Sequence, residues 1–176
     1  GYARQVATEK ANQYDQMAGF SVPRDYVMLP SKGRIYSPDS PLHNMEEIEV
    51  RHLTAADEDI LTSRSLLRSG TAIDTLLDNV IINQSIKAEE LVSGDKNAIM
   101  TFLRITGYGP EYNVEISCPG CNEDMKSEFD LTKLNMKMLD TNPIAEGQNR
   151  FSFDLPSGVN VHFKFLTSKE EKIISD

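Results

Sequence analysis

The stretch IEVRHLTAADEDILT, residues 48–62, decides the fold because it is written a second time as VHFKFLTSKEEKIIS, residues 161–175. In both copies, apolar and polar residues alternate and lead through Leu-Thr into acidic residues and an apolar pair. Alternation is typical of a half-buried strand, and Thr followed by acidic residues is typical of a helix start. The two copies therefore predict a strand that delivers a helix capped by Thr54 or Thr167. Convergence of two unrelated strand–helix junctions on the same residues is the alternative.

The residues shared by the two copies predict packing and capping. Leu53 and Leu166 are expected to pack inward at the junctions, and Asp57 occupies the position that returns a hydrogen bond to the Thr54 cap. We expect the acidic run 57–59 to be a solvated first helical turn, because three consecutive acids point around a helix.

Between the copies, the apolar period first indicates helices. One helix is predicted from Thr54 to a stop at Gly70, and a second from Ala72 to Ile82. A third is predicted to be capped by Asp95 and ended by Gly107 and Gly109. The second has a single apolar stripe, formed by Ile73, Leu76, Leu77, Val80 and Ile81. The three helices predict a small helical layer.

After Pro110 the period changes to two, which predicts strands. Alternating apolar residues lead to CPGC at 118–121, and a second extended run follows through Leu131. This pattern predicts a hairpin with the cysteines at its tip. A connector at 135–147 precedes a second hairpin, in which 150–155 and 159–165 flank Pro-Ser-Gly.

These patterns predict an α+β fold, in which small antiparallel hairpins, one with a CxxC knuckle, pack with a short-helix layer and a pseudo-repeated strand–helix unit. Residues 1–25 are expected to form a polar N-terminal arm that only a partner orders. Residues 26–109 contain the first strand and the helices, and residues 110–176 contain the CPGC hairpin and the second unit; the two segments can form one composite domain. Because the sequence starts without Met and stops inside the second helix, we expect the native chain to extend further.

Composition excludes several classes of function. A net charge of -9 with 18 scattered Lys and Arg residues disfavours nucleic acid, since phosphate binding rewards clustered positive charge. No apolar run reaches the ~18 residues that a membrane helix needs, and the start lacks an apolar signal segment. Two cysteines so close together cannot staple a secreted fold, which favours a reducing compartment.

Cys118 and Cys121 are the strongest candidates for a chemical site. Two thiolates at this spacing on a tight turn form half of a tetrahedral zinc site, because the glycine lets backbone N–H groups turn toward the sulfurs. No second CxxC exists, and His43, His52 and His162 are not at ligand spacing from one another. Zinc completed by a distant side chain or by a second copy of the chain, and a metal-free reduced pair, both stay open.

Catalysis is not predicted. A thioredoxin-like site needs its first cysteine at a helix N-terminus, whereas strand sequence surrounds this pair. The negative charge of the Asn-Glu-Asp segment at 122–124 is expected to raise the thiol pKa. The patterns GxSxG, GxxxxGK[ST] and HExxH do not occur. Binding without an enzymatic reaction is therefore expected, and no catalytic or cofactor-binding residue is assigned.

Three segments in the same order carry a resemblance to a known family: LPSKGRIYSPDSPLHNMEEIEVRHLTAADEDILTSRSLLRSGTAIDTLLDNVI, GDKNAIMTFLRITGYGPEYNVEISCPGC and LPSGVNVHFKFLTSKEE. Together they resemble the baseplate protein family of T-even-type phages over roughly residues 29–171, with the N-terminal arm outside. The resemblance implies a baseplate hub subunit or a hub-assembly chaperone of a contractile phage tail.

As partners, the resemblance implies other phage baseplate or tail hub proteins. We also expect that the chain can form a homo-oligomer, and its composition predicts no nucleic-acid or membrane partner. The expected location is the host cytoplasm during assembly, and also the virion if the protein stays in the tail. Because the zinc knuckle is incomplete, the resemblance does not carry a metal over. The alternative function is a zinc-ribbon-like adaptor that binds host or phage proteins, which metal content would distinguish.

Overall fold

The core lies between one β-hairpin and a layer of short helices in this computed structural model, which describes residues 22–142 and 144–175. Strand β1 (Arg24–Met28) pairs antiparallel with β2 (Glu47–Arg51), with Val27 opposite Ile48. Val27, Ile48 and Val50 are buried toward the helices. The alternation that predicted a half-buried strand before Thr54 is therefore confirmed.

Five helical segments complete the body. They are α2 (Ala55–Thr62), α3 (Arg64–Arg68), α4 (Ala72–Val80), the short 3-10 helix η1 (Ala88–Glu90) and α5 (Ser93–Tyr108). α2 packs on α4, α4 on η1, and α5 on β1. Each fully buried aliphatic side chain stabilises the fold by about 1.5–3 kcal/mol. The largest of them are Leu29, Leu42, Ile48, Leu76, Leu77, Ile81, Ile86, Leu91, Ile99 and Leu103.

The helix expected from Thr54 to Gly70 is in fact two helices, and Ser63 separates them. Ser63 has an extended backbone (φ -66°, ψ 111°), so it ends α2 and serves as the N-cap residue of α3. Its carbonyl oxygen accepts from Leu67 N–H at 3.0 Å. Serine favours such positions because its short polar side chain competes with the helical backbone. Gly70 follows α3 with a positive φ of 65°, which fits the predicted stop.

The apolar stripe predicted for the second helix is confirmed. Leu76, Leu77 and Val80 of α4 are buried, and so is Ile81 just beyond it. The helix ends before the predicted Ile82 because Ile81 turns extended and forms an antiparallel bridge with Val50. The chain thus leaves the helix to contact the β1–β2 hairpin.

Asp95 is not the cap of the third helix, which was the prediction. Val92 is the N-cap residue of α5, and Asp95 lies buried inside the first turn. Its carboxylate accepts from Ser31 N at 2.9 Å, Ser31 Oγ at 2.6 Å and Tyr36 OH at 2.7 Å. Burial, together with the charge of Asp95, raises the pKa of Tyr36 well above its usual range. Asp95 therefore ties the LPSKG turn to α5 across 64 positions of sequence.

Gly107 also differs from the prediction, since α5 continues through it to Tyr108. A Cβ atom at Gly107 would lie 2.9 Å from Leu53 Cδ1, so the glycine permits a close approach of the first strand–helix junction. Gly109, with φ 84°, ends the helix as predicted.

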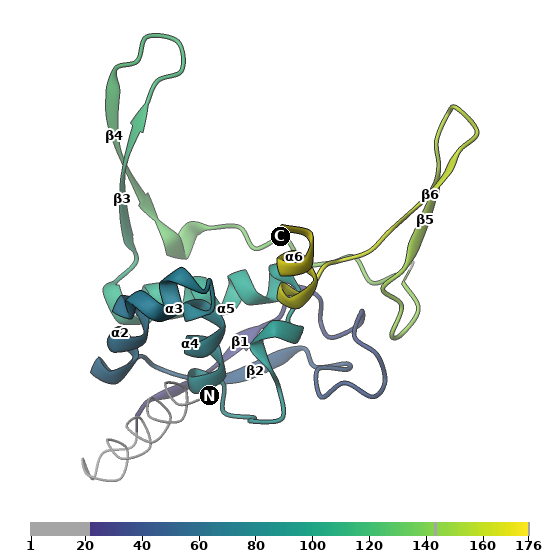
Figure 1. Cartoon of the computed structure of the whole chain (residues 1–176), viewed down its shortest axis with the longest axis horizontal. Coiled ribbons are helices and arrows are strands. Elements are labelled where there is room, and N and C mark those ends of the chain that lie inside the picture. The colour runs from purple at the N-terminus through teal and green to yellow at the C-terminus, as the bar shows by residue number, and fades with distance from the viewer. Residues whose placement is uncertain (1–21, 143, 176) are drawn as a thin grey trace.

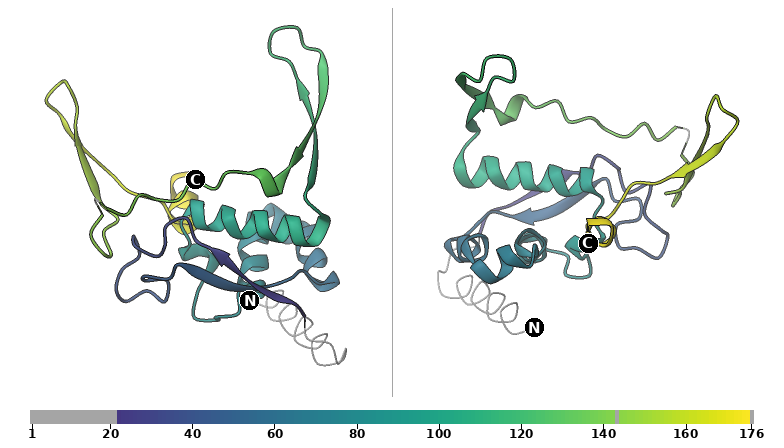
Figure 2. Two further views of the ribbon diagram at one scale, coloured as in Figure 1. Left: turned by 180° about the vertical axis from the view of Figure 1, so that it is seen from behind. Right: turned by 45° about the horizontal axis from the view of Figure 1, so that its top comes forward.

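Two further hairpins project from this body. β3 (Glu111–Ser117) pairs with β4 (Asp124–Asp130), and β5 (Phe151–Asp154) pairs with β6 (Asn160–Phe163). Figures 1 and 2 show that they rise near opposite ends of α5 and diverge. The predicted α+β fold of small hairpins and short helices is confirmed.

A long connector and a last helix complete the described chain. The 3-10 helix η2 (Leu131–Lys133) follows β4, and the described part of the predicted connector contains no helix or strand. The last helix, α6 (Ser168–Ser175), contacts η1. No helix among the described residues has the length and apolar character needed to cross a membrane. Of the expected polar arm, residues 1–21 lie outside the described residues.

Candidate interaction sites on the projecting hairpins

The β3–β4 hairpin has one apolar face that the described chain does not cover. Tyr112 lies opposite Phe129, and Ile116 lies opposite Met125. Exposed fractions of 45% for Tyr112 and 53% for Met125 show that nothing packs fully over this face. A two-stranded hairpin alone is marginally stable in water. Its apolar face is therefore a candidate contact surface.

The opposite face of the same hairpin is acidic. Glu115 lies across from Lys126, and the remaining charged residues on this face are all acids. The charged residues are Glu111, Glu115, Asp124, Lys126, Glu128 and Asp130. The hairpin is thus amphipathic, since side chains alternate between the two faces of a strand.

Arg104 of α5 fixes the base of this hairpin. Its Nη1 donates to Gly109 O at 2.7 Å and its Nη2 donates to Glu111 O at 2.9 Å. The guanidinium also lies over the rings of Tyr108 and Tyr112, 5.5 and 5.7 Å from their centroids. One side chain therefore joins the end of the helix to the start of β3.

Cys118 and Cys121 lie at the tip of the β3–β4 hairpin, as the sequence predicted. Cys118 N donates to Glu123 O at 2.9 Å, and Asn122 N donates to Cys118 O at 2.8 Å, which closes the turn. A Cβ atom at Gly120 would lie 3.8 Å from Cys118 Sγ, so the glycine of the turn lies against that sulfur. Both thiols are free, and Cys121 is exposed.

The expectation that acidic neighbours raise the thiol pKa is wrong for Cys118. The backbone N–H groups of Gly120 and Cys121, with the Cys121 thiol, lower the pKa of Cys118 below its usual value. These donors act at contact distance on the sulfur and favour the thiolate. The carboxylates behind the expectation belong to Glu123 and Asp124, which follow the cysteine pair. The sulfur of Cys121 lies 3.9 Å from Glu123 Oε2.

Metal ligands beyond the two thiols do not gather near the tip. In residues 22–142 and 144–175, no three His, Cys, Asp or Glu side chains form a group that could hold a metal ion. His43 Nδ1 lies 2.8 Å from Tyr36 O, and His52 Nε2 lies 2.7 Å from Asp25 Oδ2. His162 lies on β6, in the other hairpin. The sequence-predicted histidines are therefore not brought to the cysteines.

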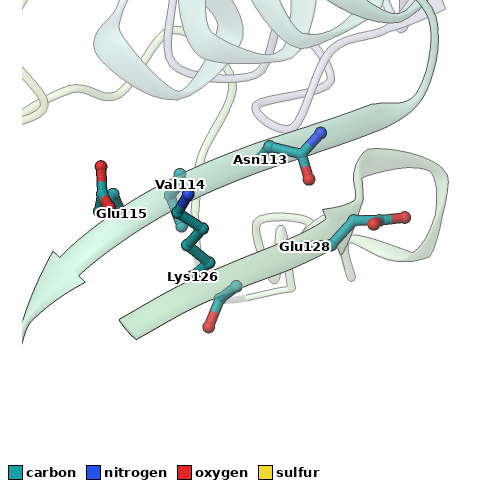
Figure 3. A pocket seen from close by; sticks show the side chains of 6 residues that line it. Asn113, Val114, Glu115, Lys126 and Glu128 are labelled. Atoms are coloured by element: carbon teal, nitrogen blue, oxygen red, sulfur yellow. The ribbon is translucent and has the colours of Figure 1, made fainter. Parts of the chain in front are cut away.

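A hollow of about 450 Å³ lies along the middle of the β3–β4 hairpin (Figure 3). Three cross-strand pairs line it, and they place Asn113 opposite Glu128, Val114 opposite Ser127, and Glu115 opposite Lys126. No histidine or cysteine lines it. It offers a polar contact surface rather than a set of reacting groups.

The β5–β6 hairpin presents an aromatic face. Phe151 stacks on Phe163 with ring centroids 5.4 Å apart, and Phe165 meets Phe151 edge-on at 5.7 Å. Phe153 lies opposite Val161 on the same face and is 58% exposed. The other face is polar, with Ser152 opposite His162. Uncovered aromatic clusters of this kind are typical of protein contact surfaces.

The two strand–helix units have equivalent contacts, which gives the repeat a structural basis. Arg51 pairs with Asp57 in the first unit, and Lys164 pairs with Glu170 in the second. Both acids also accept the backbone N–H of the capping threonine: Asp57 from Thr54 at 2.8 Å and Glu170 from Thr167 at 3.1 Å. The predicted capping boxes are therefore present.

Burial differs sharply between the two units. The expectation of a solvated Asp57 is wrong, because its side chain is fully buried against Arg51. Ile60 of α2 is 3% exposed, whereas Ile173 and Ile174 of α6 are 70% and 69% exposed. The second unit thus leaves on the surface an apolar pair whose counterparts in the first unit are buried, for Ile60, and partly buried, for Leu61.

A further hollow of about 370 Å³ lies where the connector crosses the start of α5. Ile35, Val92, Leu139 and Phe165 provide most of its apolar lining, and Asp95 is its buried acid. That carboxylate already accepts from Ser31 and Tyr36, so its oxygens are hydrogen-bonded within the fold.

The sequence located the cysteine tip but missed the uncovered apolar faces. Alternation in 112–116 indicated a strand with one apolar face, yet it carried no information on whether anything covers that face. The spacing of phenylalanines in 151–165 was the available signal for the second hairpin.

The chain matches a known protein family over most of its length. A family model described as T4 bacteriophage base plate protein matches residues 25–176. No curated protein and no solved structure matches the chain significantly.

Proposed function

Because this chain belongs to the T4 bacteriophage base plate protein family, we propose that it is a non-enzymatic hub subunit or hub-assembly factor of a contractile phage tail. Base plate proteins are parts of the phage tail, so contacts with other base plate proteins follow from membership. The hub role is the finer proposal. It is supported by the resemblance of the LPSKG turn, the RHLTAADEDIL junction and the CPGC stretch to hub proteins of T-even-type phages.

The uncovered aromatic face of the β5–β6 hairpin is the observation that carries the proposal. Phe153 and Phe163 are 58% and 55% exposed because their hairpin rises clear of the body. Burying such a pair against a partner is favourable by roughly 25 cal/mol per Å² of apolar surface. The polar face of the same hairpin bears only Ser152, Asp154, Asn160 and His162 within the paired strands.

Non-enzymatic action is supported by the chemistry at the candidate sites. Among the described residues, no hydrogen bond joins the Ser127 hydroxyl of the β3–β4 hollow to a base, and Asp95, the buried acid of the other hollow, already accepts from Ser31 and Tyr36. Catalysis by acid–base or nucleophilic groups requires such a pair within hydrogen-bond reach. Contact surfaces, not reacting groups, dominate the two hairpins.

Complementation of a phage that lacks this chain tests the proposal. Wild-type protein supplied in trans should restore tails with complete base plates, seen by electron microscopy. A Phe153→Ser/Phe163→Ser variant should fold but lower infectious particles about a hundredfold, since hot-spot residues carry most interface energy. The polar-face variant Ser152→Ala/His162→Ala is the matched control and should rescue fully.

Two outcomes would contradict the proposal: complete tails formed without the chain, or normal rescue by the phenylalanine variant. Mass spectrometry of purified virions then separates the two roles. A hub subunit stays in the particle, whereas an assembly factor is present in infected cells but absent from virions.

A further inference from the structure

The cysteine tip is a preformed half of a metal site. The turn is closed by two backbone hydrogen bonds, Cys118 N to Glu123 O and Asn122 N to Cys118 O. A Cβ atom at Gly120 would lie 3.8 Å from Cys118 Sγ, so the turn folds its glycine against that sulfur. Two thiols on one tight turn are half of the four ligands that structural zinc takes.

The missing half cannot come from the described part of the same chain. Structural zinc takes four ligands in a tetrahedron. The whole sequence has two cysteines, both in this tip, and three histidines. His43 and His52 are engaged near Tyr36 and Asp25, and His162 belongs to the other hairpin. No further ligand set forms in residues 22–142 and 144–175.

The hairpin that bears the tip is shaped to pair with another hairpin. Its apolar face has two cross-strand pairs, Tyr112 with Phe129 and Ile116 with Met125, and all four side chains are about half exposed. Its opposite face is acidic. A second copy can cover the apolar face while both acidic faces stay in water and apart. An arrangement with the same patch on both partners is the commonest kind of symmetric dimer contact.

We propose that two copies of this chain pair through the apolar faces of their β3–β4 hairpins, and that the four thiols of the two tips bind one zinc ion. A two-fold axis along the hairpins brings the tips together, and a tetrahedron of four sulfurs is compatible with that axis. Each thiol binds as a thiolate and releases its proton to water. The hairpin rises clear of the body, so both the face and the tip are accessible (Figures 1 and 2).

Purified full-length chain, reduced and supplied with zinc, tests this directly. Sedimentation equilibrium should give the mass of a dimer, and elemental analysis should give about one zinc ion per two chains. Cobalt in place of zinc should give the absorption of a tetrahedral four-thiolate site. Cys118→Ser/Cys121→Ser should be metal-free and monomeric, with the thermal midpoint of the metal-free wild type, since zinc and the second copy stabilise only the folded state. Ser157→Ala, at the tip of the other hairpin, is the control and should keep both metal and dimer.

A second variant distinguishes the contribution of the apolar face to the dimer from that of the metal. Tyr112→Ser/Phe129→Ser keeps both thiols, and the dimer should dissociate at least about a hundredfold more readily, since each buried aromatic contributes about 1.4 kcal/mol or more, which is a factor of ten. One zinc per chain in a monomer, a dimer that survives loss of both cysteines, or a metal-free monomer at excess zinc would each overturn the proposal. These measurements use the chain alone, so their failure leaves the hub proposal standing.

Discussion

Arg51 and Asp57 form a buried ion pair with two hydrogen bonds, Nη1 to Oδ2 at 2.7 Å and Nη2 to Oδ1 at 2.9 Å. Their side chains are 7% and 0% exposed. The equivalent pair of the second unit, Lys164 with Glu170, is 43% and 31% exposed. The same two sequence positions therefore hold a core ion pair in one copy and a surface ion pair in the other.

Asp57→Asn should lower the free energy of unfolding by about 3 kcal/mol, because it leaves the guanidinium of Arg51 buried without its counter-charge. Glu170→Gln is the matched control and should cost less than about 1 kcal/mol, as exposed pairs do. Urea unfolding of both variants measures the difference. Equal costs would show that the burial difference has no energetic consequence.

Stability should fall in acid, starting where Asp57 and Asp74 begin to protonate in the unfolded chain. Burial raises the pKa of each, but hydrogen bonds and positive charge outweigh it: Arg51 and Thr54 at Asp57, and Lys172 and Lys96 at Asp74. Both folded-state pKa values therefore lie below the usual 3.8. Their contribution is complete above about pH 5 and is lost as pH falls through the folded pKa values.

Thermal midpoints measured from neutral pH downward check this pH dependence. The gap between wild type and Asp57→Asn should begin to narrow below the usual aspartate pKa, where Asp57 protonates in the unfolded chain. It should close below the lowered folded-state pKa of Asp57, since both proteins then have a neutral side chain at position 57. A gap that stays constant down to acid unfolding would contradict the assignment of the charge to Asp57.

Gly33→Ala should cost about 3 kcal/mol or prevent folding. The backbone of Gly33 has φ 69°, and a Cβ there would lie 2.2 Å from Met45 N and 2.5 Å from Leu42 O. Gly70→Ala is a control for φ alone, because Gly70 has φ 65° and open space around it. It should cost about 1–2 kcal/mol, the penalty of a left-handed residue with a side chain. Chemical denaturation measures both, and similar losses would mean that the backbone clash relaxes freely.

Arg104→Ala should loosen the base of the β3–β4 hairpin without unfolding the body. The variant loses two hydrogen bonds, to Gly109 O and Glu111 O, and the ring contacts with Tyr108 and Tyr112. Amide hydrogen exchange should speed up roughly thirtyfold in 111–130, since each of the two lost bonds contributes about 1 kcal/mol. Arg68→Ala on α3 is the control. Unchanged exchange in the hairpin would show that Arg104 does not hold it.

The change of hydrophobic period after Pro110 was enough to predict the hairpins, and the stripe from Ile73 to Ile81 was enough to predict α4. These features depend on local alternation, which sequence displays directly. Capping at Thr54 and Thr167 was predictable for the same reason, because cap and acid are three residues apart.

Features that depend on distant partners were not predictable. Asp95 resembled a cap, but it is buried against Ser31, which lies 64 positions away. From sequence, Asp57 resembled a solvated acid, but in the structure it is buried against Arg51. Exposure of Tyr112 and Phe153 was equally hidden, since a strand pattern shows that a face is apolar and not what lies on it.

The two hairpins diverge from near opposite ends of α5, so a chain that docks through both of them, as proposed above, is bivalent. Once one hairpin is docked, the second hairpin meets its own partner subunit at an effective concentration that the helix between the two hairpins sets. Linking two contacts in this way raises avidity by about 10²–10⁴-fold without any new contact. It does so only for neighbours whose spacing matches the separation of the tips. The length and direction of α5 would then set the spacing of the subunits that both hairpins can bind at once.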